Sequence, residues 1–191
     1  MFITINLRFI IPLVLLMVTV ASVYAGDRDV AKEQKEIREK TTETLKWLYE
    51  LQPSAKEAIK NSYGYAVFSN FGMKILVVGG GKGKGEAINK KTGKETFMKM
   101  LELQAGLGMG IKKFRVVFVF ENKKVFNKFV NSGWEFGGQS TVAAKLDDQG
   151  GAFTGAAIVS PGVWIYQLTE DGLALELTVK GTKYMKDKDL N

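Results

Sequence analysis

The spacing of apolar residues along the chain changes near Tyr63. Before this point apolar residues recur every three or four positions, with charged residues on the opposite face, which is typical of an amphipathic helix. The apolar positions are Val30, Ile37, Leu45, Leu48 and Leu51. Beyond Tyr63 the period falls towards two, which indicates strands. The pattern therefore predicts N-terminal helices at about 29–61 and a β-rich body at about 63–191.

Local signals set the expected ends of the helices. Asp27 or Asp29 can cap the first helix, and Pro53 ends it because proline cannot continue a helical hydrogen-bond ladder. Ser54, followed three residues later by Glu57, predicts a capping box at the start of a second, short helix. This second helix is predicted to end at about residues 61–64.

Short apolar or β-branched segments then alternate with turns that contain glycine. The predicted strands are Tyr65 to Ser69, Lys74 to Val78, Gly85 to Ile88, Glu95 to Leu103, Leu107 to Ile111, Phe114 to Phe120, Thr141 to Leu146, Phe153 to Val159, Val163 to Leu168 and Leu173 to Val179. Glycine at residues 93, 151 and 172 fits turns that need positive φ. Neighbouring strands are therefore expected to pair antiparallel.

One segment is expected to lie at the centre of the sheet. Phe114 to Phe120 is apolar on both faces after Arg115, which is typical of a strand covered on both sides. Asn122 can cap a short helix that follows it and extends to Asn131. The prediction is an α+β domain, with N-terminal helices packed on a mainly antiparallel, glycine-rich β-sheet curled into a sandwich or barrel.

The first 25 residues have the pattern of a signal peptide. Arg8 is their one charged residue, an apolar run follows, and Val23 and Ala25 are the small residues that signal peptidase recognises. An uncleaved membrane anchor is the alternative, but Pro12 interrupts the run, which is shorter than the roughly 20 residues of a membrane span. We expect cleavage between Ala25 and Gly26, export to a Gram-negative periplasm, and a single mature domain at 26–191 that is soluble or peripheral on a membrane.

Composition excludes several classes of function. The chain has no Cys and no His, so it has neither a thiolate metal site nor the side chain that most often acts as a general base. Ser140 lacks the second glycine of a nucleophile elbow. The carboxylate pairs 147–148 and 170–171 fall in predicted turns, where they serve turn chemistry. We predict no catalytic residue, no metal and no cofactor.

The acidic residues near the C-terminus are weak candidates for a cation site. Asp187 and Asp189 alternate with Lys186 and Lys188, whose charges neutralise theirs. We expect this segment to be a solvated tail.

The charge balance favours an anionic partner. The whole chain has a net charge of +7, and loss of the first 25 residues removes one Arg and no acid, so the mature domain stays basic. Such a field attracts phospholipid headgroups, lipopolysaccharide or nucleic acid. Export makes nucleic acid the poorest of these, so the expected partner is an anionic phospholipid or membrane surface.

The glycine-rich stretch 79–85 resembles a phosphate-binding loop but has the wrong spacing. Lys84 stands where the third glycine of a dinucleotide fingerprint is required, and Glu86 stands where a Walker motif requires Lys. These glycines are therefore assigned to a turn and close strand packing.

Basic residues around this stretch are the candidate headgroup-binding site. The predicted residues are Lys82, Lys84, Lys90, Lys91 and Lys94, which a hairpin could bring into one positive rim. A second group of basic residues with few acids beside them in sequence lies where a predicted strand begins, at Lys112, Lys113 and Arg115. The alternative is a solvated charged surface that keeps the protein soluble.

Several segments, in order, resemble the SYLF domain family. They are Tyr63 to Phe68, the glycine stretch 79–85, the strand Arg115 to Phe120 with its following helix, and Gly137-Gly138 leading into Val142 to Ala144. The resemblance runs from about Ser54 to the C-terminus. It implies lipid binding, chiefly of phosphorylated or anionic headgroups, and an association with actin in eukaryotic relatives. Actin does not fit an exported protein.

The predicted function is that of an exported, non-enzymatic protein that binds anionic phospholipid or another envelope anion. A structural or interaction protein of the cell envelope without lipid preference is the main alternative. An unrecognised enzyme is the other, and it should expose a concave pocket with convergent polar groups.

Overall fold

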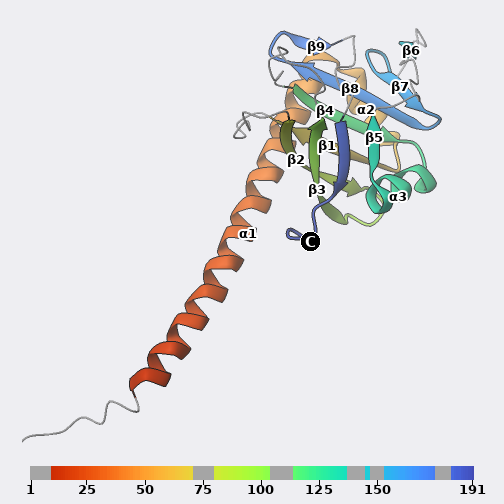
Figure 1. The fold of residues 1–191 in the computed structure, drawn as a ribbon. Helices are drawn as coiled ribbons and strands as arrows, with labels where there is room; N and C mark the ends of the chain where they lie inside the picture. Colours follow the sequence, from red (N-terminus) through yellow and green to blue (C-terminus); the bar gives the residue numbers. More distant parts are fainter. Residues whose placement is uncertain (1–9, 71–79, 104–113, 137–144, 147–152, 175–181) are drawn as a thin grey trace, which may run out of the picture. The chain divides into compact units, whose positions relative to one another are not determined.

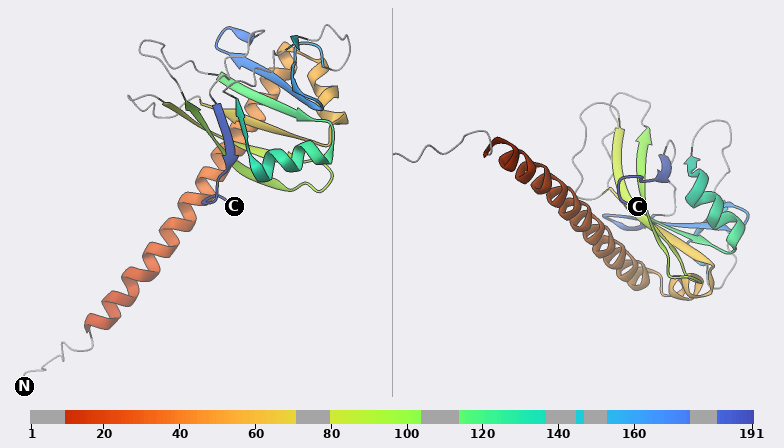
Figure 2. Two further views of the ribbon diagram at one scale, coloured as in Figure 1. Left: turned by 45° about the vertical axis from the view of Figure 1, so that its right-hand side comes forward. Right: turned by 90° about the horizontal axis from the view of Figure 1, so that it is seen from below.

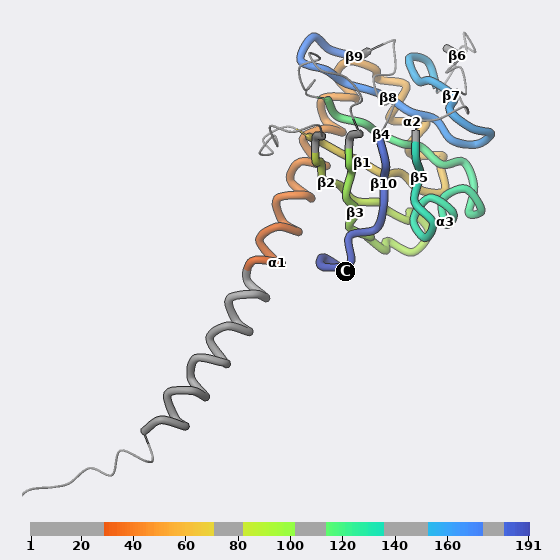
Figure 3. Tube along the Cα trace, in the orientation of Figure 1, coloured from red at the N-terminus to blue at the C-terminus, as the bar shows by residue number. Residues whose placement is uncertain are grey.

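The computed structural model describes residues 10–70, 80–103, 114–136, 145–146, 153–174 and 182–191 (Figure 1). Figure 3 draws the same Cα trace as a tube. The chain divides into two units, Met1–Glu36 and Ile37–Asn191. The described part of the first unit is the N-terminal portion of helix α1, which spans Ile10–Leu51. Among the described residues, no helix combines the length and apolar character that a membrane crossing requires. The fold and the sites below belong to the second unit.

Helix α1 begins earlier than the sequence pattern indicates. The prediction of a start at Asp27 or Asp29 is wrong for the full-length chain, since the helix is already formed at Ile10. The physical reason is that Pro12 lies in the first turn, where proline is tolerated, and Gly26 costs only about 1 kcal/mol, which does not stop a helix with good residues on both sides.

Helix α2 spans Ser54–Asn61 and lacks the predicted capping box. Pro53 occupies the N-cap position and no side chain caps the helix. The Ser54 hydroxyl instead accepts a hydrogen bond from Gln52 Nε2 at 2.7 Å, because Ser54 is the first helical residue and not the residue before it. Ala55, Ala58 and Ile59 are buried and hold the helix on the sheet.

The strands form one antiparallel sheet in the described residues (Figure 1). They are β1 (Gly64–Ser69), β2 (Gly80–Asn89), β3 (Glu95–Leu103), β4 (Phe114–Phe120), β5 (Trp134–Phe136), β6 (Lys145–Leu146), β7 (Ala157–Ser160), β8 (Val163–Thr169), β9 (Gly172–Ala174) and β10 (Thr182–Lys186). Their order is β5-β10-β3-β2-β1-β4-β8-β7-β6, and β9 pairs with β8. Every pairing is antiparallel, so the predicted α+β class with an antiparallel sheet is confirmed.

The predicted bounds of β3 and β4 are confirmed, whereas those of β2 are too short. The glycines from Gly80 to Gly85 lie inside β2, so the turn predicted for them is not there. Their close packing is confirmed, because a Cβ on Gly85 would lie 2.0 Å from the Val67 carbonyl oxygen. The strand predicted from Phe153 begins at Ala157. The predicted strands 74–78 and 107–111 lie outside the described residues, as does most of 141–146 and 173–179.

Strands β5 and β10 are not predicted by the sequence pattern. The expected solvated tail is wrong, because β10 pairs with both β3 and β5 inside the sheet. After β10, the Asp187 amide donates to the Phe97 carbonyl at 3.0 Å. The Asn191 side chain then binds both the amide and the carbonyl of Phe97, at 3.0 and 2.8 Å. The C-terminal residues therefore continue the pairing of β10 along β3.

Two apolar layers cover the sheet, one on each face (Figure 2). On the first face, helix α3 (Lys123–Ser132) packs Phe126, Phe129 and Val130 against sheet residues that include Phe68 and Phe118. We call this the α3 face. On the other face, α2 and the last turns of α1 pack on residues that include Val67, Val117 and Tyr166, and we call it the α1 face.

Strand β4 is buried at every residue, which confirms its predicted central position. Asn122 caps α3 as predicted, with its side chain accepting a hydrogen bond from the Val125 amide at 3.2 Å. Both features therefore follow from local sequence.

Candidate functional site

The structure separates the predicted headgroup-binding residues into two groups. Lys82 and Lys84 lie within β2, whereas Lys90, Lys91 and Lys94 lie at the turn between β2 and β3. A strand rises about 3.3 Å per residue, so six residues from Lys84 to Lys90 correspond to roughly 20 Å. The predicted single positive rim is therefore not formed, because an unbroken strand separates the groups.

One of the three turn lysines, Lys90, has a structural role. Lys90 Nζ donates hydrogen bonds to the carbonyls of Ile59, at 2.7 Å, and of Lys60, and so satisfies the C-terminal end of α2. Burial, and then the charges of Lys91 and Lys60, hold the pKa of Lys90 below its usual value. Lys91 and Lys94 are exposed. Lys90 therefore stabilises α2, while Lys91 and Lys94 remain candidates for surface binding.

Two lysines that were not among the predicted site residues, Lys99 and Lys183, lie beside Lys82 and Lys84 in the sheet. Lys99 of β3 lies directly opposite Lys84, and Lys82 lies opposite Leu101, whose partner on the other side is Lys183 of β10. Cβ atoms of directly opposed residues are about 4.5–5.5 Å apart. Lys82, Lys84, Lys99 and Lys183 therefore form one group on three adjacent strands, which we call the lysine cluster.

The lysine cluster lies on the α1 face. A Cβ on Gly83 or Gly85 would meet Met100 or Phe68 of the α3 face, so the alternate residues Lys82 and Lys84 point the other way. Lys82 and Lys183 are exposed, and Lys84 and Lys99 are half-buried. Lys183 forms an exposed ion pair with Glu135 of β5 at 3.5 Å. The result is a basic surface built on three strands of the sheet.

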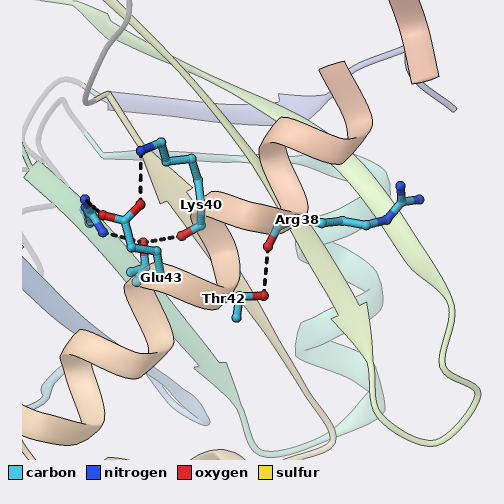
Figure 4. A network of polar contacts seen from close by, with 6 residues as sticks. Arg38, Lys40, Thr42 and Glu43 are labelled. Carbon is cyan, nitrogen blue, oxygen red and sulfur yellow. Dashed lines mark hydrogen bonds and ion pairs between the residues drawn. The ribbon is translucent and has the colours of Figure 1, made fainter. Parts of the chain in front are cut away.

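An ion-pair network borders this cluster (Figure 4). Arg115 of β4 lies in the same cross-strand row as Lys99, Lys84 and Ser69. Its guanidinium binds Glu43 of α1 at 2.7 Å and lies over the Trp47 ring, 5.3 Å from the centroid. Lys40 binds the other Glu43 oxygen at 3.0 Å.

Within this network Arg115 holds α1 on the sheet, so its charge is used for packing and not for binding a ligand. The hydrogen bonds from Arg115 and then Lys40 hold the pKa of Glu43 below its usual value. The Arg115 side chain is 8% exposed. Arg115, one of the uncancelled cations predicted from the sequence, is therefore paired and buried, and Lys112 and Lys113 lie outside the described residues.

Glu86 is a buried carboxylate on the same face. Burial raises its pKa, while a hydrogen bond with Thr41 of α1 acts in the opposite direction. Its Oε2 atom has no hydrogen-bond partner. Acidic side chains do not cluster in a metal-binding arrangement within the described residues.

The other catalytic candidates give no site either. Glu170 and Asp171 are exposed in the turn between β8 and β9, as predicted. Ser140 and the carboxylates at 147–148 lie outside the described residues.

Residues 101–191 match the family model Ysc84, described as "Las17-binding protein actin regulator". The resemblance to the SYLF family is confirmed. A relative, Beta cell expansion factor A of Aeromonas veronii, is 40% identical to the chain over 143 residues. This match covers 75% of the chain and 53% of the relative, so the chain spans about half the length of the curated relative. The family description names actin regulation, and neither description names a catalysed reaction.

Sequence reasoning missed two of the four lysines for different reasons. Lys99 has a weak signal, because the predicted strand 95–103 places it on one face with Phe97, but its partner depends on the register of the hairpin. Lys183 has no signal, because the sequence pattern predicts no strand after Val179. The matched region contains Lys183, while Lys82, Lys84 and Lys99 precede it.

Proposed function

We propose that the protein is an exported, non-enzymatic SYLF-type protein that binds the anionic headgroups of a phospholipid bilayer through the lysine cluster. The observation that carries this proposal is the convergence of four lysines on three neighbouring strands of one face. Their combined positive charge suits an anionic surface.

The expected strength of binding follows from the number of charges. Each basic residue near an anionic membrane contributes about 1 kcal/mol, and this attraction falls off within a Debye length of about 8–10 Å. Four lysines therefore support reversible binding that weakens with added salt. Lys82 and Lys183 carry most of it, since they are the exposed members.

Export through a cleaved leader completes the proposal. The protein purified from its native host should begin at Gly26, and the measurement is the intact mass. A mass that includes residues 1–25 would contradict cleavage and the proposed periplasmic location.

The test of binding is co-sedimentation with phosphatidylglycerol vesicles, compared with phosphatidylcholine vesicles. Lys82→Gln, Lys84→Gln and Lys183→Gln combined should reduce binding about tenfold or more, because both exposed members of the cluster are removed and each contributes about 1 kcal/mol. The matched control replaces three exposed lysines of α1 and α2, namely Lys46, Lys56 and Lys60, by Gln. Equal binding by the cluster variant and the wild type would rule out the cluster.

A further variant separates the two groups predicted from the sequence. Lys91→Gln with Lys94→Gln should leave binding within about twofold, while Lys90 is kept because it satisfies α2. A larger loss here than in the cluster variant would move the site to the turn. If the wild-type protein shows no preference for anionic vesicles, the result would instead favour the alternative function, that of an interaction protein of the cell envelope.

A further inference from the structure

The outward side of helix α3 carries a second, separate group of lysines. Lys123, Lys124 and Lys128 are all exposed, and none forms an ion pair with another described residue. The helix, Lys123–Ser132, contains no acidic residue at all. Its inward residues are the phenylalanines of the α3 face. The exposed side of α3 therefore carries three basic residues and no acidic one.

Helix stability does not explain these lysines. Lys123 and Lys124 occupy the first turn, where the positive end of the helix dipole favours acidic residues and disfavours cations. Asn122 provides the N-cap without their help. Two lysines at this position weaken the helix, and neither forms an ion pair with a described carboxylate. Their charge is consistent with an external anionic partner.

The α3 lysines and the lysine cluster lie on opposite faces of the same sheet. α3 packs on Phe68 and Phe118 of the α3 face, whereas Lys82 and Lys84 project from the α1 face. One flat surface cannot contact both sides of a sheet that is also covered by a helix. If the cluster contacts a bilayer, the α3 lysines face away from that bilayer.

We propose that the outward face of α3 binds a second anionic phospholipid bilayer, so that one protein molecule links two membranes. The occupant is a bilayer because the three ammonium groups are spread along the helix surface, which suits a broad layer of anionic headgroups by charge complementarity. This inference rests on the proposed function for the first membrane contact. It adds a membrane-linking activity that binding at the lysine cluster alone does not provide.

The experiment measures binding and vesicle clustering on the same samples. Protein purified from its native host is mixed with phosphatidylglycerol vesicles, binding is measured by co-sedimentation, and clustering by turbidity and dynamic light scattering. Lys123→Gln, Lys124→Gln and Lys128→Gln combined should leave sedimentation within about threefold of the wild type while at least a tenfold higher protein concentration is needed for half-maximal turbidity. The Lys46, Lys56 and Lys60 control should cluster vesicles like the wild type.

A charge-reversal variant separates loss of binding from loss of folding. Lys123→Glu with Lys124→Glu places acids at the positive end of the helix dipole, so its melting temperature should be unchanged or higher while clustering is lost. Undiminished clustering by either α3 variant overturns the inference. If the wild-type protein binds vesicles but does not cluster them, the membrane-linking inference is overturned and the proposed function stands. If the wild-type protein does not bind vesicles at all, the proposed function is overturned as well.

Discussion

The two faces of the sheet are buried in different ways. On the α3 face, Phe68, Phe118, Phe129 and Tyr184 form a continuous group of rings, with centroids 4.7 to 6.1 Å apart. On the α1 face, apolar packing around Leu48 and Tyr166 gives way to charged contacts between α1 and β2, β3 and β4. The difference indicates that the α3 face supplies most of the stability, whereas the α1 face combines stability with exposed charge.

The charged contacts on the α1 face differ in how far their side chains are exposed to solvent. Arg38 binds Glu95 at 2.8 Å and lies over Phe97, but both charged side chains are more than a third exposed. Exposed ion pairs contribute about 0–1 kcal/mol. The Arg115–Glu43 pair is expected to contribute more, because the guanidinium is buried.

The largest expected effect is on the α3 face. Phe118 is fully buried and contacts rings from β1, α3 and β10, so Phe118→Ala should lower the free energy of unfolding by about 3–5 kcal/mol. Urea denaturation followed by fluorescence measures this change. Leu51→Ala, at a residue that is 40% exposed, is the control and should change it by less than about 0.5 kcal/mol. Equal losses in both variants would contradict the assignment of the core.

The next effect tests the close packing between β1 and β2. Gly85→Ala puts a Cβ against the Val67 carbonyl and the Phe68 ring, and backbone atoms cannot move aside as a flexible side chain can. We expect a loss of about 2–3 kcal/mol in the same denaturation experiment. Gly93→Ala, in the open turn at φ +71°, should cost about 1 kcal/mol from backbone strain alone. A smaller loss at Gly85 than at Gly93 would contradict the close approach.

A smaller effect is expected at the ion pair of the α1 face. Glu43→Gln weakens the contact with the buried Arg115 guanidinium, but Glu43 itself is 52% exposed, so the loss should be about 1 kcal/mol. Because the pKa of Glu43 is lowered in the folded protein, its contribution is present above the ordinary value of 4.5 and is lost as the pH falls through the folded-state pKa. Denaturation should show a larger difference between variant and wild type at pH 7 than at pH 3.

The smallest effect has the opposite sign and comes from Glu86. Its pKa is raised by burial, so the wild type loses stability as the pH rises through the folded-state pKa of this carboxyl. Glu86→Gln removes that ionisation and should raise the melting temperature by a few degrees above neutral pH, with no gain below pH 4. A variant that is less stable at every pH would show that the carboxylate is needed in its charged form.

Local chemistry determined much of the fold directly. Alternation and β-branched residues set the bounds of β3 and β4, and Asn122 set the start of α3. Gly93 and Gly172 adopt the positive φ that their turns require, at +71° and +113°. Each of these features depends on residues that are neighbours in sequence, which is why sequence alone predicts them.

The sequence failed where a segment depends on distant partners. β10 has only five residues and two exposed lysines, so nothing local marks it as a strand, and it forms because β3 and β5 supply hydrogen-bond partners. Ser54 and Glu57 have the spacing of a capping box, yet the chain enters α2 one residue earlier through Pro53. Local spacing alone does not settle where a helix starts.

For the candidate site, the sequence alone determined that the chain is basic, lacks Cys and His, and carries Lys82 and Lys84 in a glycine-rich stretch. The sequence could not determine that Lys99 and Lys183 lie beside Lys82 and Lys84. Nor could it determine that Lys90, Lys91 and Lys94 lie apart from them. Those facts depend on cross-strand register and on the path of β10, which make direct neighbours of residues up to 82 positions apart, such as Leu101 and Lys183. Tertiary structure decided the site because charges combine through space and not along the chain.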